Sequence, residues 1–378
     1  MSPVAPPPAG VTVTPVHRDA ELTAFIRLPH RLYAGNPHWT PPLDAGQRAL
    51  LDPARRHPFH DTATVQPFLA RRGRRAVGRI VAVDDPRQNE GGFGLFESED
   101  APEVSGALFT AASQWLRSRG REALLGPLNL STNHECGLLV DGFDTPPVML
   151  MPYNPAYYQD LFETFGLKPA KDLWSWTIDL TEPFPERITR LRDRLAQRHR
   201  CVLRPLDLDR LDAEADMLRR MYNEAWQGSW GFNPMSEAEF RHTVRELKPL
   251  LHRGVTLVAE VDGVPAGFGM ILPDAAPALR AARGRLWTYG LPLGALRLAR
   301  GLRRAETGRA LLIGILAKHR GKGIDVLLRV AGLERARELG MRTLNASWVL
   351  EDNTASNRGI VAMGGRRGVT HRLYELGL

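Results

Sequence analysis

One segment in the second half of the chain constrains the fold most. An apolar run over 309–317 is followed at once by a basic, glycine-containing turn and by an amphipathic pattern that ends near Leu339. The run predicts a buried strand, and the later spacing predicts a helix. Glycines between a strand and a helix leave backbone N–H groups directed outward at the positive end of the helix dipole. The segment therefore predicts an α/β protein with an anion site at this turn.

The residues of the turn support a phosphate or pyrophosphate as the anion. The turn reads HRGKGID, in which Arg320 and Lys322 add full positive charges. Gly321 and Gly323 allow the backbone to approach an anion without a Cβ in the way. The alternative is an ordinary solvated loop, but the strand before the turn and the helix after it favour phosphate binding.

This pattern resembles the coenzyme A loop of the GCN5-related N-acetyltransferases, Gln/Arg-x-x-Gly-x-Gly/Ala. Arg320, Gly323 and Asp325 stand at its three defined positions, and Asp325 departs from the small residue usual there. The family also implies an asparagine on the pantetheine arm, which here is Asn353. The residues that the resemblance implies for binding acyl-CoA are Ile315, Leu316, Ala317, Arg320, Gly321, Lys322, Gly323, Ile324, Asp325 and Asn353.

The two halves of the chain repeat one pattern of strands and helices. Asn154 precedes Gly166, and Asn353 precedes Gly365, by the same spacing around a predicted helix. The resemblance therefore implies an α/β fold of two GCN5-related domains, each a mixed, mostly antiparallel sheet flanked by helices. We expect a disordered leader over 1–10, a degenerate domain over 11–182 for structure or acceptor recognition, and an acyl-CoA domain over 183–378.

Charge separates the two halves. Residues 1–185 carry 17 Lys and Arg against 21 Asp and Glu, whereas residues 186–378 carry 33 against 21. The excess of positive charge predicts an anionic partner for the second half. The basic half has no interleaved aromatic pattern, which argues against a nucleic-acid partner. The two cysteines stand in no metal-ligand spacing, so we expect no metal.

The first half has acidic residues where a phosphate loop would stand. Glu97, Glu99, Asp100 and Glu103 surround the start of a predicted helix. Carboxylates at a helix N-terminus interact with the dipole themselves and repel a pyrophosphate. We therefore expect only the second half to bind coenzyme A.

The acid and base of an acyl transfer are harder to place. The resemblance implies a glutamate near the splayed strand and a tyrosine on the last helix. The strand over 309–317 has no carboxylate, and the tyrosine position falls at Ile360 or Val361. We therefore take Glu351 and Tyr374 as candidate catalytic residues. His371, Glu260 and Asn345 are further candidates. For each of them, a structural role is the alternative.

A polar loop in the first half is the candidate acceptor site. The sequence NLSTNHE over 129–135 concentrates hydrogen-bonding side chains, and His134 with Glu135 would form a proton relay. A polar loop satisfied by its own contacts is the alternative. The predicted substrate-binding residues are Asn129, Asn133, His134 and Trp226.

An insertion over 279–310 carries eight arginines against one acid, with leucines at helical spacing. Such a helix suits an anionic membrane surface, and packing against the protein is the alternative. The predicted function is acyl-CoA-dependent transfer of an acyl group, acetyl or longer, to an amine. The alternatives are a long-chain acyltransferase for a lipid amine at the membrane and a catalytically silent acyl-CoA-binding module. We expect a cytoplasmic protein, without a spanning segment, that contacts the membrane only peripherally.

Overall fold

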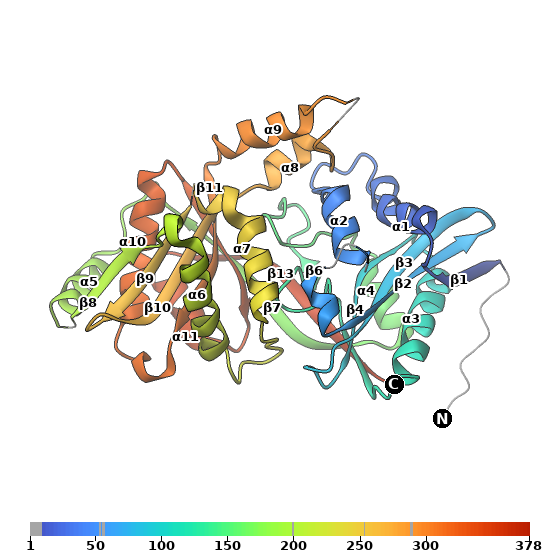
Figure 1. Ribbon diagram of the computed structural model, residues 1–378, viewed down its shortest axis with the longest axis horizontal. Helices are drawn as coiled ribbons and strands as arrows, with labels where there is room; N and C mark the ends of the chain where they lie inside the picture. The colour runs from blue at the N-terminus through green and yellow to red at the C-terminus, as the bar shows by residue number, and fades with distance from the viewer. Residues whose placement is uncertain (1–9, 53, 55–56, 199, 253, 288–289) are drawn as a thin grey trace. The chain divides into compact units, whose positions relative to one another are not determined.

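A computed structural model describes residues 1–378 except 1–9, 53, 55–56, 199, 253 and 288–289 (Figure 1). Most of the expected leader over 1–10 lies outside the described residues. The chain forms two compact units, residues 1–173, 276–298 and 369–378 (unit 1) and residues 174–275 and 299–368 (unit 2). Both units are mixed, mostly antiparallel sheets flanked by helices, as predicted.

Unit 1 takes its elements mainly from the first half of the chain. They are β1 (Val11–Pro15), α1 (Asp19–Leu32), α2 (Asp44–Leu51), β2 (Thr64–Arg72), β3 (Arg75–Asp84), β4 (Gly91–Ser98), α3 (Pro102–Arg117), β5 (Ala123–Gly126), β6 (Leu138–Asp141), α4 (Tyr158–Phe165) and the start of β7 (Lys168–Asp179). Strands β1 to β4 pair antiparallel in chain order, and β4 pairs with β5 in parallel.

The sheet of unit 1 carries a core on each face because successive strand residues point to opposite sides. Ile80 and Ala82 of β3 pack with α3 and α4. Val81 and Val83, between and after them, pack with Phe25 of α1. The stretch Ile80–Val83 of β3 is thus apolar on both faces, which is typical of a strand covered by helices on both sides.

Unit 2 repeats this order of elements. They are α5 (Glu186–Arg198), β8 (Cys201–Pro205), α6 (Leu211–Ala225), α7 (Glu237–Leu251), β9 (Val255–Val261), β10 (Val264–Pro273), β11 (Thr307–Ile315), α10 (Ile324–Glu338), β12 (Thr343–Leu350), α11 (Thr354–Ala362) and the start of β13 (Arg366–Gly377). Strands β8 to β11 pair antiparallel, and β11 pairs with β12 in parallel.

The boundaries of the units differ from the residue ranges expected from the sequence. Trp176 and Ile178, in the second part of β7, pack in the core of unit 2. Strand β13 pairs with β5 and β6, and its Tyr374 lies in the core of unit 1. The last strand of each half therefore contributes to the other unit, which the local sequence pattern does not indicate.

The insertion forms two short helices, α8 (Ala276–Ala282) and α9 (Leu293–Leu302). Helix α8 belongs to unit 1, where Arg280 donates to Thr40 Oγ1 at 2.8 Å and the N–H of Asp44 donates to the carbonyl of Gly284 at 3.0 Å. The first part of the insertion therefore packs on the protein. In the part of the chain that the structure describes, no helix is long and apolar enough to cross a membrane.

Candidate functional site

The predicted anion turn lies where β11 and β12 of unit 2 part. Their parallel pairing covers only Thr307–Ala310 on β11 and Thr343–Ala346 on β12, although both strands continue beyond it. Strand β11 then leads through a short turn of 3-10 helix (Ala317–His319) to α10. The two strands therefore separate before the end of β11, which is the end that leads to α10.

Four consecutive backbone N–H groups in this turn have no hydrogen-bond acceptor among the described residues. They belong to Gly321, Lys322, Gly323 and Ile324. Gly321 and Gly323 have φ angles of +73° and +76°, which residues with a side chain adopt only with strain. Gly323 is the N-cap of α10, so the helix dipole adds to the field of these donors. The turn thus has the donor geometry of an anion site, as the sequence predicted.

The cationic side chains of the turn have different roles. Arg320 donates to the carbonyl of Ala225 at 2.6 Å and to that of Ile315 at 3.3 Å, so it braces the turn. Lys318 and Lys322 are exposed and supply mobile positive charge. Burial and these two lysines lower the pKa of His319, which keeps the imidazole neutral at pH 7. The direct charge on a bound anion would come from the lysines.

Asp325, the departure from the family pattern, lies in the first turn of α10. Its carboxylate attracts the buried guanidinium of Arg329, although burial leaves the pKa of Arg329 below its ordinary value. Asp325 is partly buried and makes no cap at Gly323. The acid therefore interacts with a cation of its own helix.

The other residues predicted for acyl-CoA, and the candidates Glu351 and Trp226, belong to unit 2 as well. Ile315 ends β11, and the N–H of Leu316 donates to the carbonyl of Ala266 at 3.0 Å. Asn353 is the exposed N-cap of α11, where its Oδ1 accepts from the N–H of Ser356 at 3.2 Å. Ala317 and Glu351 are exposed. Trp226 packs its ring against Phe268, with centroids 6.0 Å apart.

Two of the predicted catalytic candidates, Tyr374 and His371, belong to unit 1. Tyr374 is fully buried in the core of unit 1, and its hydroxyl is 3.4 Å from Glu163 Oε1. Burial raises the pKa of Tyr374 to about 12. His371 is also buried, and its Nε2 is 3.0 Å from the carbonyl of Pro152. These contacts are those of core residues.

At the equivalent junction of unit 1, from β4 to α3, the uninterrupted row of open donors is absent from the described contacts, because two N–H groups are engaged and a proline follows. The N–H of Ser98 donates to the Tyr158 hydroxyl at 2.9 Å and the N–H of Glu99 to the carbonyl of Val77 at 3.0 Å. Pro102 begins α3 and has no N–H. This junction therefore lacks the row of open donors that unit 2 has.

The acidic cluster at this junction is arranged differently from our expectation. Ala101 caps α3, and no carboxylate caps the helix. Glu99 pairs with Arg31, Arg72 and Arg75, and Glu103 pairs with Arg72. Arginines of α1 and of the β2–β3 hairpin therefore pair with the two acids, and Glu103 also lies in the first turn of α3.

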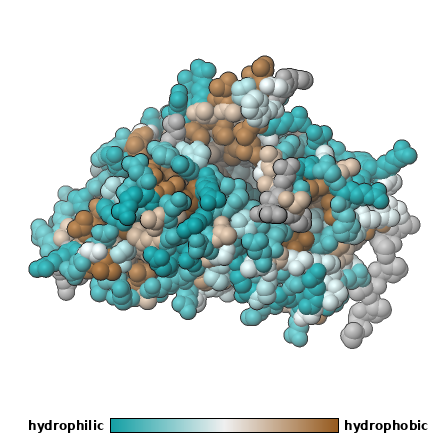
Figure 2. Space-filling view, in the orientation of Figure 1, coloured by the Kyte–Doolittle hydropathy of each residue, from teal (hydrophilic) through white to brown (hydrophobic). Residues whose placement is uncertain are grey.

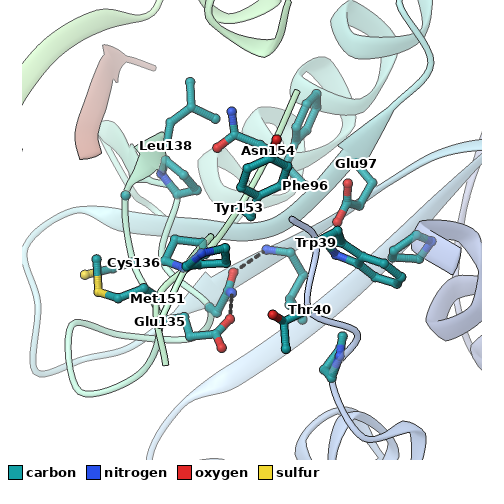
Figure 3. Close-up of a pocket in the computed structure, with 18 of the residues that line it drawn as sticks. Trp39, Thr40, Phe96, Glu97, Glu135, Cys136, Leu138, Met151, Tyr153 and Asn154 are labelled. Atoms are coloured by element: carbon teal, nitrogen blue, oxygen red, sulfur yellow. Dashed lines mark hydrogen bonds between the residues drawn. The ribbon is translucent and has the colours of Figure 1, made fainter. Parts of the chain in front are cut away.

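The fourth acid, Glu97, is buried in a cavity of about 130 Å³ that lies within unit 1 (Figure 3). Its Oε2 accepts from the hydroxyls of Tyr158 at 2.7 Å and Tyr33 at 2.9 Å. The buried guanidinium of Arg79 lies 3.5 Å from Oε1. Burial raises the pKa of the Glu97 carboxyl, and Arg79 and the two phenols oppose that rise. This buried polar network is the main feature of the candidate site that the sequence analysis did not predict.

A signal for Glu97 was present in the sequence. Glu97 lies in β4 among Phe93, Leu95 and Phe96, all of them buried, so a charge at this position had to be paired or functional. Grouping Glu97 with the three acids that follow it concealed this difference, because those acids lie beyond or at the end of the strand.

The polar loop over 129–135 contributes to the same cavity. Asn129 and Glu135 line it, and Asn129 Nδ2 donates to Glu135 Oε2 at 3.1 Å. His134 does not line the cavity; its Nδ1 lies 3.0 Å from Ser131 Oγ, and its ring packs against Phe59. Asn133 is also not part of the lining. The structure thus brings Asn129 and Glu135 together at the cavity, and His134 is not part of the lining.

Comparisons with known proteins agree with this fold. No protein-family model matches the chain. The chain is 39% identical to the bacterial ceramide synthase of Caulobacter vibrioides, over 98% of both chains. It is 33% identical to protein YghO of Escherichia coli, over 94% of this chain and 92% of that one.

Solved structures of low sequence identity share the fold. A tandem GNAT protein from the clavulanic acid biosynthesis pathway matches with a TM-score of 0.56 at 14% identity, over 97% of this chain and 98% of that one. A GCN5-related N-acetyltransferase from Sphaerobacter thermophilus matches with a TM-score of 0.54 at 13% identity, over 98% and 96%. The near full-length relatives show that the chain belongs to the family of the Caulobacter ceramide synthase, and its fold is that of the GCN5-related N-acetyltransferases.

Proposed function

We propose that the chain transfers an acyl group from acyl-CoA to the amine of a long-chain lipid. The observation that carries the proposal is the row of four open N–H groups at Gly321–Ile324, with Lys318 and Lys322 beside them. This arrangement suits the pyrophosphate of coenzyme A. The lipid acceptor is suggested by the relative named a ceramide synthase.

The reaction needs no covalent enzyme intermediate. The neutral amine attacks the thioester carbonyl, so the C–N bond forms as the C–S bond breaks and the thiolate leaves. One group must first take a proton from the ammonium, and another must protonate the thiolate. Among the predicted acid and base candidates, Glu351 lies on the unit that carries the anion turn, and Asn353 near it is proposed to contact the pantetheine arm.

The test is calorimetric titration with acetyl-CoA and palmitoyl-CoA, combined with a thiol-release assay that uses a long-chain amino alcohol. We expect tight binding by the natural chain, with palmitoyl-CoA preferred. The double variant Lys318→Glu/Lys322→Glu should lose at least about 100-fold in affinity, because it places two negative charges against the pyrophosphate. Lys168→Glu, at an exposed site of unit 1, is the matched control. Failure of the folded natural chain to bind either thioester would overturn the proposal.

Peripheral contact with the membrane is a second proposal, supported by α9. Leu293 and Leu296 on this helix, with Trp287 and Leu291 before it, are 37%, 62%, 63% and 57% exposed. Figure 2 shows hydrophobic residues gathered around α8 and α9. Exposed arginines accompany these apolar side chains: Arg297, Arg300, Arg303 and Arg304. Exposed apolar residues with arginines suit an anionic bilayer surface.

Sedimentation with vesicles tests this contact. We expect binding to vesicles that contain phosphatidylglycerol and little binding to pure phosphatidylcholine. Leu293→Ser/Leu296→Ser should reduce the bound fraction several-fold, whereas Leu339→Ser, at a leucine that is 45% exposed at the end of α10, should not. Equal binding by all variants would exclude α9 as the contact.

A further inference from the structure

The cavity of unit 1 is built as a binding site in the half of the chain that was expected to be structural or to recognise the acceptor. Its lining contains three charged side chains, Glu97, Glu135 and Arg79. One guanidinium and two carboxylates give the lining one excess negative charge when both acids are ionised. The whole chain carries a net charge of +8, so the negative charge of this lining is opposite in sign to that of the protein.

The lining holds acceptors for a ligand that donates hydrogen bonds, although Arg79 Nε is also buried there without an acceptor. Besides the two carboxylates, Gln47 lines the cavity, and its buried Oε1 has no hydrogen-bond donor. A buried acceptor without a donor costs about 1–3 kcal/mol, which a ligand that donates hydrogen bonds would recover. An ammonium group has three such donors and a positive charge.

Aromatic and apolar side chains form the rest of the lining. Tyr33 stacks on Trp39 with ring centroids 4.8 Å apart and planes inclined by 8°. Figure 3 shows Glu97 beside Trp39, and Glu135 on another side of the cavity with Cys136 and Met151. Aromatic faces attract cations. The apolar members of the lining suit an alkyl chain: Leu138, Val148, Met149, Met151, Phe162 and Leu279.

We propose that this cavity binds a primary alkylammonium ion, with Glu97 and Glu135 as its counter-charges and the apolar lining around its chain. The role of this ion as the acyl acceptor rests on the proposed function, whereas the binding itself does not. Unit 1 then recognises the acceptor, and unit 2 holds the pyrophosphate of the acyl donor.

Leu279 ties the insertion to this site. It lies on α8, the helix held to unit 1 through Arg280 and Thr40, and it contributes to the cavity wall. Thr40 also lines the cavity. The first helix of the insertion therefore closes part of the proposed amine site.

Calorimetry on the full chain with three ligands of equal chain length tests the proposal: dodecylamine, dodecanol and dodecanoate, each below its aggregation concentration. We expect dodecylamine to bind at least about tenfold more tightly than dodecanol, and dodecanoate to bind least, because only the amine carries a charge opposite to that of the lining. Equal affinities for the three ligands would overturn the proposal.

Substitutions at the two acids test which carboxylates bind the ammonium group. Glu97→Gln and Glu135→Gln should each weaken dodecylamine binding about 10- to 100-fold and leave dodecanol binding unchanged. Glu135→Gln keeps the test valid if Glu97→Gln fails to fold, since Glu135 is outside the contacts of Glu97 with Arg79 and the phenols. Glu163→Gln, on the exposed side of α4 in the same unit, is the matched control. Unchanged dodecylamine binding in folded Glu135→Gln and Glu97→Gln would contradict the assignment.

Titration of acyl-CoA in the same preparations separates this inference from the proposed function. If the amine binds and acyl-CoA does not, the proposed function fails and the cavity remains a cation site. If acyl-CoA binds and dodecylamine shows no preference over dodecanol, the proposed function stands and the cavity assignment fails.

Discussion

The two units share one order of strands and helices, but they differ where the fourth strand of the order meets its helix. In unit 2, β11 leads through two glycines of positive φ to α10, and four N–H groups remain open. In unit 1, the N–H groups of Ser98 and Glu99 at the junction of β4 and α3 donate within the protein, and the carboxylate of Glu97 lies in a cavity. The comparison shows how one architecture presents unengaged N–H donors at this junction in one unit and a buried carboxylate in the other.

The largest expected effect concerns the buried charges of unit 1. Arg79→Met leaves Glu97 without its cation in a dry environment, and such a loss costs about 3–5 kcal/mol of unfolding free energy. Arg75→Met, at an exposed partner of Glu99, should cost less than about 1 kcal/mol. Chemical denaturation measures both, and hydrogen exchange shows whether the sheet of unit 1 opens. Similar costs for the two variants would mean that the Glu97 network is not tightly coupled to the fold.

The next effect separates the two glycines of the anion turn. An added Cβ at Gly323 would lie 2.6 Å from Leu195 Cδ1, whereas the space at Gly321 is open. Gly321→Ala should cost only the strain of its positive φ, about 1–2 kcal/mol. Gly323→Ala should cost more and weaken acyl-CoA binding about tenfold beyond Gly321→Ala.

Leu195→Ala provides the matched test for that clash. In the Gly323→Ala background it should restore part of the affinity, because it removes the side chain that the new Cβ contacts. Calorimetry with acyl-CoA checks each variant. Equal losses at the two glycines, without any rescue, would show that strain and not packing decides the geometry of the turn.

A smaller effect follows from the raised pKa of Glu97. The carboxyl protonates at a pH above its ordinary value of 4.5, because burial opposes the charged form. Protonation removes the counter-charge for an ammonium. Dodecylamine affinity should therefore be complete at neutral pH and fall as the pH is lowered, starting above 4.5. In Glu97→Gln, the loss of affinity at acidic pH should begin at a lower pH. An unchanged pH dependence in this variant would show that another group titrates.

The smallest expected effect is that of Tyr374→Phe. The hydroxyl lies in the core of unit 1 at 3.4 Å from Glu163, a long contact with an exposed carboxylate. Its loss should change the unfolding free energy by less than about 1 kcal/mol and turnover by less than about twofold. Thiol release measures the second quantity. A loss of turnover of 100-fold in a folded variant would identify Tyr374 as the acid and revise the division of labour between the units.

Much of unit 2 could be predicted from local sequence. The apolar run over 309–317, the glycines at 321 and 323 and the helical spacing after them lie within one segment, and backbone geometry alone decides what they form. The role of Arg320 could not be predicted from the local sequence. Its guanidinium donates to Ala225, which is 95 residues earlier in the chain, so it braces the turn in a way that the motif does not show.

The cavity of unit 1 could not be predicted in the same way. Glu97, Arg79, Tyr33 and Tyr158 come from β4, β3, the end of α1 and α4, and no short spacing joins them. Asn129 and Glu135 were recognised because they are close in sequence, whereas His134 turned out to contact Ser131 and Phe59.

The sequence by itself determined the fold class, the repeated order of elements and the anion turn, because hydrophobic period and glycine placement act over neighbouring residues. Only the tertiary structure decided which acids are paired at the surface and which one is buried, and that the last strand of each half contributes to the other unit. The physical reason is that desolvation and long-range strand pairing depend on partners far away along the chain.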